Sequence, residues 1–338
     1  MKFLTLFAGL IGVAVTIWLV ANQGLGSVVH VLSQAGWQLL WIVPFHALPI
    51  LLDAEGWRTL LAPRDPERRA GLGYLFWVAA VREAANRLLP VANVGGEVIG
   101  IRLVLLRKLD GAAVTASVII EVLLTLMNQY VFTALGLVLL IALTHATAMT
   151  WTILVGLALS LPVPVLIGAL LRYGSIFERM ERVVEHLLGD RSKLAALLGG
   201  SSLDTEIRAL YNHHWRLVGA MLWQLAGYVA GSFETWFALR LLGAPVDFGT
   251  AIAIEGLTQA VRHFAFFVPA GLGVQEAGLV LFGQMVGFGN DIALSLSLAK
   301  RMRELLFGLP PLIWWQWLES NRLHRKLSQR KSGPSGPA

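Results

Sequence analysis

Five consecutive residues, Lys300-Arg301-Met302-Arg303-Glu304, place three positive charges and one negative charge between the apolar segments 292–299 and 305–317. The planar guanidinium of arginine can donate two parallel hydrogen bonds to a phosphate or carboxylate. At 1.5 Å per residue, Lys300 lies about 12 Å along a helix that begins at Ile292. The group is therefore a candidate anion site inside an apolar layer. The alternative is a helix end whose long side chains reach the surface of that layer.

Other ionisable residues also interrupt apolar stretches. A charge at the centre of a bilayer costs about 2.5–3.5 kcal/mol on insertion scales, so each one needs a cavity, a partner or a ligand. With residues 300–304, the candidate binding site contains Arg82, Glu97, Glu121, Arg262 and Glu276. The remaining charges of this kind are Glu55, Glu83, Arg87, Arg102, Glu234, Arg240 and Glu255, together with His263.

Two long apolar stretches, residues 73–106 and 249–288, are each broken near the middle by a Gly/Pro-rich turn. We interpret each as a re-entrant helical hairpin, which lipid tolerates only if the exposed backbone is buried in protein or lines water. Amides at the start of a half-helix can bind an anion, although glycine breaks can also serve helix packing alone. The turn residues of the candidate site are Pro90, Asn93, Gly95 and Gly96 in the first stretch and Pro269, Gly271 and Gly273 in the second.

The broken stretches belong to a weak internal duplication with a constant separation of 179 residues (234 − 55). Duplications of this kind are typical of transporters whose site lies between the repeats. We predict repeat halves at about 37–143 and 215–318. At the same separation Glu121 corresponds to Lys300, so we predict that these opposite charges face one another across a water-accessible cavity. The recurring pairs are Glu55 and Glu234, Trp57 and Trp236, Pro90 and Pro269, and Glu97 and Glu276.

The composition is that of a membrane protein. Hydrophobic residues make up 56% and charged residues 14% of the chain, and the mean hydropathy is +0.66, whereas soluble domains are about 25% charged. At about 20 residues per span, the 338 residues hold roughly seven to nine hydrophobic segments. The absence of cysteine excludes disulfides, thiolate metal sites and a cysteine nucleophile. We predict an all-α polytopic membrane protein without cofactor or metal, in which residues 1–326 form a single integral membrane domain.

Outside the hairpins, single spans are predicted at 3–21, as a retained signal anchor, and at 37–61, 112–143, 150–171, 215–242 and 292–318. The polar connection 172–214 has Ile176, Met180, Val183 and Leu187 on one helix face. We interpret it as an amphipathic helix on the membrane surface, with a partner-binding helix as the alternative. The basic tail 327–338 is predicted to be disordered.

Lysine and arginine collect in residues 63–71, 107–108, 172–216 and the tail, whereas residues 22–36 and 144–149 carry no charge. The basic segments are predicted to be cytoplasmic, together with both termini. The net charge of +6 therefore reflects membrane orientation and not binding to nucleic acid. If the basic segments are cytoplasmic, the first hairpin enters the membrane from the cytoplasm and the second enters it from the outer face. The duplication is then inverted, which allows one site to be exposed to either side in turn.

The segments Leu89-Pro90-Val-Ala-Asn-Val-Gly-Gly-Glu97 and Val268-Pro269-Ala-Gly-Leu-Gly-Val-Gln-Glu276 resemble the flippase-like membrane domain of the lysylphosphatidylglycerol synthase family. Within that family, Gly36-Trp37, Leu48-Pro49 and Leu88-Leu89-Pro90 are most similar to the HpnL group of hopanoid-biosynthesis-associated membrane proteins. The resemblance covers nearly the whole chain. It implies a bacterial inner-membrane protein that moves or handles a lipid, such as a hopanoid or another polar lipid.

Aminoacyl transfer is not implied, because the family carries it on a soluble domain after the membrane part, and this chain ends about 20 residues after its last predicted span. A lipid translocator competes with an intramembrane enzyme that uses Glu97, His263 or Glu276 as general base. His263 is more often a structural hydrogen-bonding residue. A scaffold for lipid-biosynthetic enzymes is the third reading. The expected partners are a membrane lipid and either a second copy of the chain or such enzymes.

Overall fold

The computed structural model describes residue 30 and residues 33–89, 95–144, 148–175, 177–179, 200–264 and 273–331. Helices are the regular secondary structure of these ranges. The helices before residue 175 are η1 (Gly36–Trp41), α3 (Ile42–Phe45), α4 (Ala47–Leu61), η2 (Ala62–Arg64), α5 (Leu72–Leu88), α6 (Gly95–Leu105), α7 (Gly111–Thr144), α8 (Ala148–Ser160) and α9 (Pro162–Tyr173). Those after residue 199 are α12 (Gly200–Asn212), α13 (His214–Leu241), α14 (Phe248–Phe264), α15 (Val274–Val286) and α16 (Asn290–Lys331).

Three helical segments of the described chain are long and apolar enough to cross a membrane, namely Ser33–Arg64, Gly111–Leu143 and Trp151–Tyr173. The all-α membrane class predicted from composition is confirmed. The predicted span 150–171 consists of α8 and α9, which meet at Leu161. Pro162 is the first residue of α9, a position where the missing amide hydrogen costs no helical hydrogen bond.

The two Gly/Pro-rich stretches each contain a pair of contacting helices, α5 with α6 and α14 with α15. The second helix of each pair is short, 11 residues in α6 and 13 in α15, whereas a full span needs about 20. Gly273 precedes α15 with φ of +78°, a conformation that favours glycine. The turns themselves, residues 90–94 and 265–272, lie outside the described residues, and with them the site candidates Pro90, Asn93, Pro269 and Gly271.

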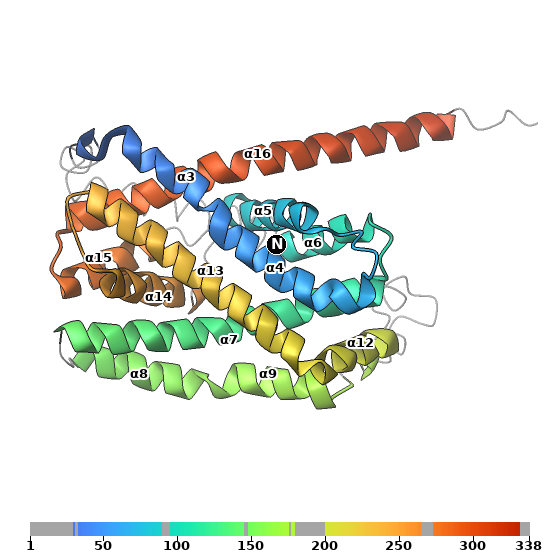
Figure 1. The fold of residues 1–338 in the computed structure, drawn as a ribbon, viewed down its shortest axis with the longest axis horizontal. Coiled ribbons are helices and arrows are strands. Elements are labelled where there is room, and N and C mark those ends of the chain that lie inside the picture. Colours follow the sequence, from blue (N-terminus) through green and yellow to red (C-terminus); the bar gives the residue numbers. More distant parts are fainter. Residues whose placement is uncertain are drawn as a thin grey trace, which may run out of the picture.

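The helices contact one another in matched sets (Figure 1). In the first half α4 contacts α5, α5 contacts α6, α6 contacts α7, and α4 contacts α7. In the second half α13, α14, α15 and α16 contact one another in the same order. Between the halves, α5 packs against α16, α14 packs against α7, and α13 lies along α4. These three contacts hold the two halves together.

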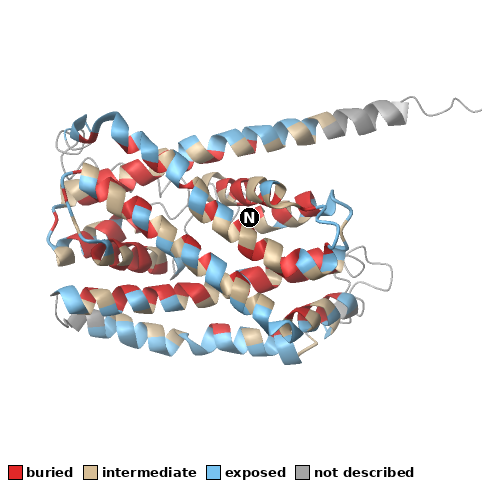
Figure 2. Cartoon of the chain, in the orientation of Figure 1, coloured by how far each residue is buried: buried red, intermediate tan, exposed pale blue. Residues whose placement is uncertain are grey.

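Burial separates the core from the outer faces (Figure 2). Trp57 of α4 is fully buried, and its indole nitrogen donates a hydrogen bond of 3.0 Å to the hydroxyl of Ser117 on α7. By contrast α8 and α9 expose large apolar side chains, among them Trp151 and Leu159. An exposed apolar band of this kind is a lipid-facing surface.

The structure bears on two further predicted segments. α16 continues to Lys331, so residues 327–331, placed in the basic tail, are helical, as expected for a run of Leu, Arg, Lys and Gln with high helix propensity. In the connection 172–214, α12 is a helix whose Leu203, Ile207 and Leu210 are buried against apolar residues of α7 and α9. The predicted span 3–21 and the helical face formed by residues 176, 180, 183 and 187 lie outside the described residues.

Candidate functional site

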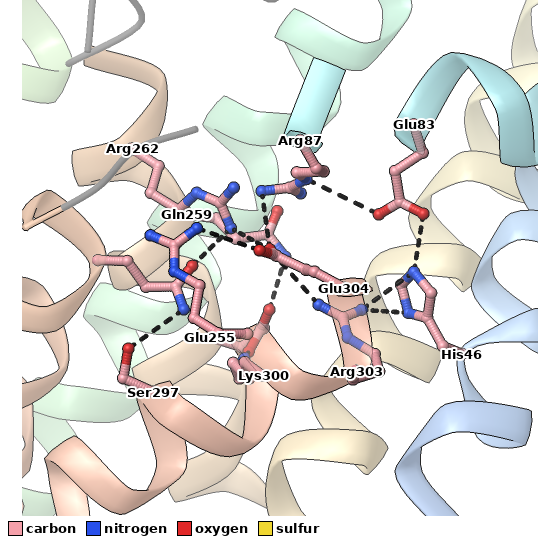
Figure 3. A network of polar contacts seen from close by, with 12 residues as sticks. His46, Glu83, Arg87, Glu255, Gln259, Arg262, Ser297, Lys300, Arg303 and Glu304 are labelled. Atoms are coloured by element: carbon pink, nitrogen blue, oxygen red, sulfur yellow. Dashed lines mark hydrogen bonds and ion pairs between the residues drawn. The ribbon is translucent and has the colours of Figure 1, made fainter. Parts of the chain in front are cut away.

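The group Lys300–Glu304 lies inside α16, well away from either end of that helix. The side chains of Lys300, Arg303 and Glu304 are buried, and Arg301 is half-buried. Their partners come from helices α5, α13, α14 and α15 and from His46, the residue between α3 and α4 (Figure 3). The charges thus lie within the protein and are not presented at a helix end.

Arg303 makes contacts with both an acidic residue and a histidine. Its Nε lies 3.2 Å from Glu234 Oε1 on α13, and its Nη1 hydrogen-bonds the ring of His46. The ring of His46 also lies between two carboxylates, with Nε2 2.8 Å from Glu83 Oε2 and Nδ1 3.1 Å from Glu234 Oε2. His46 therefore connects the first hairpin, which carries Glu83, to α13 and α16 of the second half.

Glu304 sits among arginines from three helices. Its Oε1 lies 3.6 Å from Arg87 on α5, 3.6 Å from Arg262 on α14 and 3.8 Å from Arg303. Oε2 accepts a hydrogen bond of 3.1 Å from Arg301. Oε1 is buried and, among the described residues, has no donor within hydrogen-bonding distance. The three guanidinium groups thus surround an oxygen that none of them binds directly.

Lys300 and Arg301 are held by acidic residues of the second hairpin. The ammonium of Lys300 binds Glu255 on α14, whose carboxylate also accepts a hydrogen bond of 2.5 Å from the Thr235 hydroxyl. Arg301 Nε donates to Glu276 on α15 over 3.3 Å. The same Glu276 oxygen accepts a hydrogen bond from Ser297, one turn before Arg301 on α16. The basic face of α16 is therefore already matched by carboxylates.

These residues form one buried assembly, which we call the Glu304 network. Its five cationic side chains are balanced by five carboxylates if every carboxylate is ionised, with His46 between them. The cations are Arg87, Arg262, Lys300, Arg301 and Arg303, and the carboxylates are Glu83, Glu234, Glu255, Glu276 and Glu304.

A second buried cluster, the Arg82 cluster, consists of Arg82, Glu97 and Glu121 on α5, α6 and α7. Nη1 of Arg82 donates to both oxygens of Glu121 at 2.9 Å, and Nη2 donates to Glu97. The guanidinium also lies over the ring of Trp57, 4.6 Å from its centroid, in a cation–π contact. A single cation is thus shared by two carboxylates in a closely packed site.

Two glycines allow α6 to approach Arg82. A Cβ added at Gly96 would lie 2.4 Å from the carbonyl oxygen of Arg82, and one at Gly100 would lie 2.5 Å from its Cδ. The amide of Gly96 donates a hydrogen bond of 2.8 Å to the Asn86 side chain, which fixes the start of α6 to α5. Gly96 therefore has a packing role in the described structure, and Gly95 is the first residue of the same helix.

The predicted pairing of Glu121 with the 300–304 group is not what the structure shows. Glu121 binds Arg82, and Lys300 binds Glu255. Residue numbers alone cannot predict this, because the rotation and tilt of each helix decide which side chains meet. The other predicted residues fall into the two assemblies, Arg82 and Glu97 in the first and Arg262, Glu276, Arg301, Arg303 and Glu304 in the second.

His46 is a residue of the Glu304 network that the sequence analysis does not single out. It is neutral in a formal charge count, so a search for charged residues in apolar segments passes over it. A search for any polar side chain in the predicted span 37–61 finds it. His263, considered as a general base, is exposed, and its Nδ1 lies 2.8 Å from the Gln259 carbonyl oxygen of its own helix. No cluster of His, Asp and Glu suited to a metal ion occurs in the described ranges.

The helical fold, the apolar outer faces and the buried ionisable assemblies define an all-α membrane protein in which polar side chains gather between the helices. The chain belongs to the family of the lysylphosphatidylglycerol synthase TM region, whose family model matches residues 5–311. Membership places the protein in a membrane and connects it with membrane lipid. No curated protein and no solved structure matches the chain.

Proposed function

We propose that the protein moves a polar membrane lipid between the two leaflets of the bacterial inner membrane. The headgroup passes the Glu304 network while the acyl or terpenoid tails stay in lipid. The observation that carries the proposal is the composition of this network, which gathers five cations and five carboxylates in the interior of a membrane protein of a lipid-related family.

Stability alone is a poor reason to keep such an assembly. Each buried ion loses its hydration, and well-packed apolar residues of similar volume are often as stabilising as a buried ion pair or more so. Intramembrane ionisable residues instead mark pathways for polar substrates. Arg87, Arg262 and Arg303 converge on Glu304 from three helices, an arrangement that suits the three oxygens of a phosphate as well as a carboxylate.

The matched helix contacts support alternating access. If α4 to α7 and α13 to α16 are inverted repeats, each contact within one half has its counterpart in the other, and the contact of α5 with α16 corresponds to that of α14 with α7. A rocking motion of one half against the other can then expose the site between them to each side in turn. The Glu304 network lies on this boundary, because Glu83 and Arg87 belong to the first half and Glu304 to the second.

The described arrangement is a closed one. The hollow bounded by His46, Glu83, Arg87, Glu304 and Phe307 has a volume of about 10 Å³, which corresponds to a single water molecule. A headgroup enters only if the ion pairs separate, and a headgroup phosphate that replaces the Glu304 carboxylate keeps the arginines paired. The displaced carboxylate then needs a new cation or a proton, which makes Glu304 a candidate for coupling to proton movement.

The direct test is reconstitution of the purified protein in lipid vesicles that contain fluorescently labelled phosphatidylglycerol, with labelled phosphatidylcholine for comparison. Translocation predicts that label in the inner leaflet becomes accessible to a membrane-impermeant quencher, with the labelled lipid chemically unchanged. An altered lipid mass in the vesicles, without label movement, would favour the intramembrane enzyme instead. Comparing the outer-membrane lipids of a deletion strain with those of wild type tests whether the natural cargo is a hopanoid.

The inverted arrangement predicts the position of the connecting segments. Reporter tags at residues 66, 195 and 335 are expected in the cytoplasm, and tags at residues 146 and 246 in the periplasm, because lysine and arginine collect in the former segments. Enzymatic reporters fused at each position measure this in cells. If residues 66 and 246 lie on the same side, the repeats are parallel and alternating access loses its basis.

A further inference from the structure

A cavity of about 360 Å³ opens at the end of α4, far from the Glu304 network. It is bounded by the last turns of α4, the loop 62–71 and the first turn of α13, and three of its lining residues are Arg58, Arg68 and Arg216. Arg58 follows His46 by twelve residues, about 18 Å along a helix. The cavity, which we call the Arg68 cavity, shares no residue with the Glu304 network or the Arg82 cluster. Its size is within the range of roughly 300–1,000 Å³ that is usual for small-ligand sites.

The walls of the Arg68 cavity are held in place by other charged groups. Asp65 accepts hydrogen bonds from the amides of Arg69 and Ala70, at 2.8 and 2.9 Å, so this carboxylate fixes the loop. Arg64 forms a bidentate ion pair with Glu206 on α12, at 2.9 and 2.7 Å. The loop is therefore built before any ligand arrives, which lowers the ordering cost of binding.

The arginines around this loop differ in what they bind. Arg69 pairs with Glu67, Arg107 stacks on Tyr74 with 3.9 Å from its guanidinium carbon to the ring centroid, and Arg58 pairs with Glu55 at 2.5 Å. Within the described chain, Arg68 has no hydrogen bond or ion pair through its guanidinium. Arg216 makes one long hydrogen bond, 3.4 Å, to the carbonyl oxygen of Thr59. Of these arginines, Arg68 and Arg216 have neither a carboxylate partner nor a ring contact in the described ranges, and both line the cavity.

The backbone of Arg68 adds an independent observation. Its φ is +53°, in the left-handed region, which costs a residue with a Cβ free energy that glycine does not lose. A strained backbone at a ligand-facing residue is typical of binding sites, where the gain from the side chain offsets the strain.

We propose that the Arg68 cavity is a binding site for a phosphate group, held by the guanidinium groups of Arg68 and Arg216. Arginine is suited to this ligand because its fork donates two parallel hydrogen bonds. The lining contains three arginines, Arg58, Arg68 and Arg216, and two carboxylates, Glu55 and Asp65, so its formal net charge is positive. The phosphate belongs either to a lipid headgroup or to a free phosphate ion. This phosphate site is separate from the lipid path through the Glu304 network, and the experiments below test it independently of that path.

Two binding experiments distinguish a lipid headgroup from a free phosphate ion as the ligand of the Arg68 cavity. Inorganic phosphate is titrated calorimetrically into the protein in an uncharged detergent, and phosphatidylglycerol adducts are compared with diacylglycerol adducts by native mass spectrometry. Arg68→Gln and Arg216→Gln are each expected to weaken phosphate-group binding about tenfold, equivalent to about 1.4 kcal/mol. Arg69→Gln removes the same charge from the adjacent residue, which does not line the cavity, and should leave binding within about twofold of wild type on the same scale.

The variant Arg68→Gly tests whether weaker phosphate binding could result from misfolding of the protein. Glycine relieves the left-handed backbone, so this variant should unfold at a higher temperature than wild type and still bind phosphate about tenfold more weakly. A purely structural Arg68 would not give these opposite changes. If Arg68→Gln and Arg216→Gln weaken binding of free phosphate, the ligand is a soluble phosphate. If they weaken binding of phosphatidylglycerol alone, the ligand is a lipid headgroup. If neither ligand distinguishes Arg68→Gln from Arg69→Gln, the inference is wrong.

Discussion

The Arg82 cluster and the Glu304 network bury similar side chains but arrange them differently. In the first, one guanidinium serves two carboxylates at hydrogen-bonding distance and is packed against Trp57 and the glycines of α6. In the second, one Glu304 oxygen lies 3.6–3.8 Å from three guanidinium groups and adjoins a hollow. We infer from this comparison that the Arg82 cluster holds α5, α6 and α7 in fixed positions, whereas the arginines around Glu304 can exchange partners.

The largest effect is expected from removing the single cation of the Arg82 cluster. Arg82→Ala leaves the buried Glu121 without its cation and leaves Glu97 with only a long hydrogen bond from Asn86. Breaking a buried ion pair in this way costs about 3–5 kcal/mol. The free energy of unfolding in detergent measures the loss, with expression level as a second readout. A change below about 1 kcal/mol, the size expected of exposed pairs, would show that the cluster is not a structural joint.

A smaller effect is expected from removing one of the several cations around Glu304. Arg87→Gln leaves Arg262 and Arg303 beside the same carboxylate and retains a hydrogen-bond donor, so the free energy of unfolding should fall by about 1 kcal/mol. The same denaturation assay compares it with Arg82→Gln. If Arg87→Gln destabilises the protein as much as Arg82→Gln does, the network is as rigid as the cluster and the contrast between them disappears.

The smallest effect is expected at an exposed ion pair on the same helix as the network. Arg102 of α6 pairs with Glu319 of α16, and its side chain is 65% exposed. Arg102→Gln should change the free energy of unfolding by about 0.2–1 kcal/mol and leave lipid movement at the wild-type rate. This variant provides the background against which losses in the buried assemblies are judged, and a marked loss of lipid movement would place the functional path along α6 and the end of α16.

The sequence predicts segments better than it predicts partners. Hydrophobicity depends on residue type, so the helices around residues 112–143 and 215–242, and the breaks after Leu88 and before Gly273, can be recognised without a structure. The pairing of Glu121 with Arg82 depends on the rotation of α5 and α7, which packing sets and which no residue count reveals. His46 was missed for a related reason, because only the structure shows that Glu83, Glu234 and Arg303 all meet at its ring.

Arg303→Lys tests most directly whether the Glu304 network is the path of the lipid headgroup. Lysine keeps the positive charge near Glu234 and Glu304 but loses the planar fork. The measurement is the rate at which labelled phosphatidylglycerol changes leaflet in vesicles that contain equal amounts of wild type, Arg303→Lys or Arg102→Lys. We predict that Arg303→Lys folds normally and moves lipid about tenfold more slowly, a change of about 1.4 kcal/mol in the barrier, while Arg102→Lys matches wild type. Equal rates for all three proteins would show that the lipid headgroup does not pass the Arg303 guanidinium.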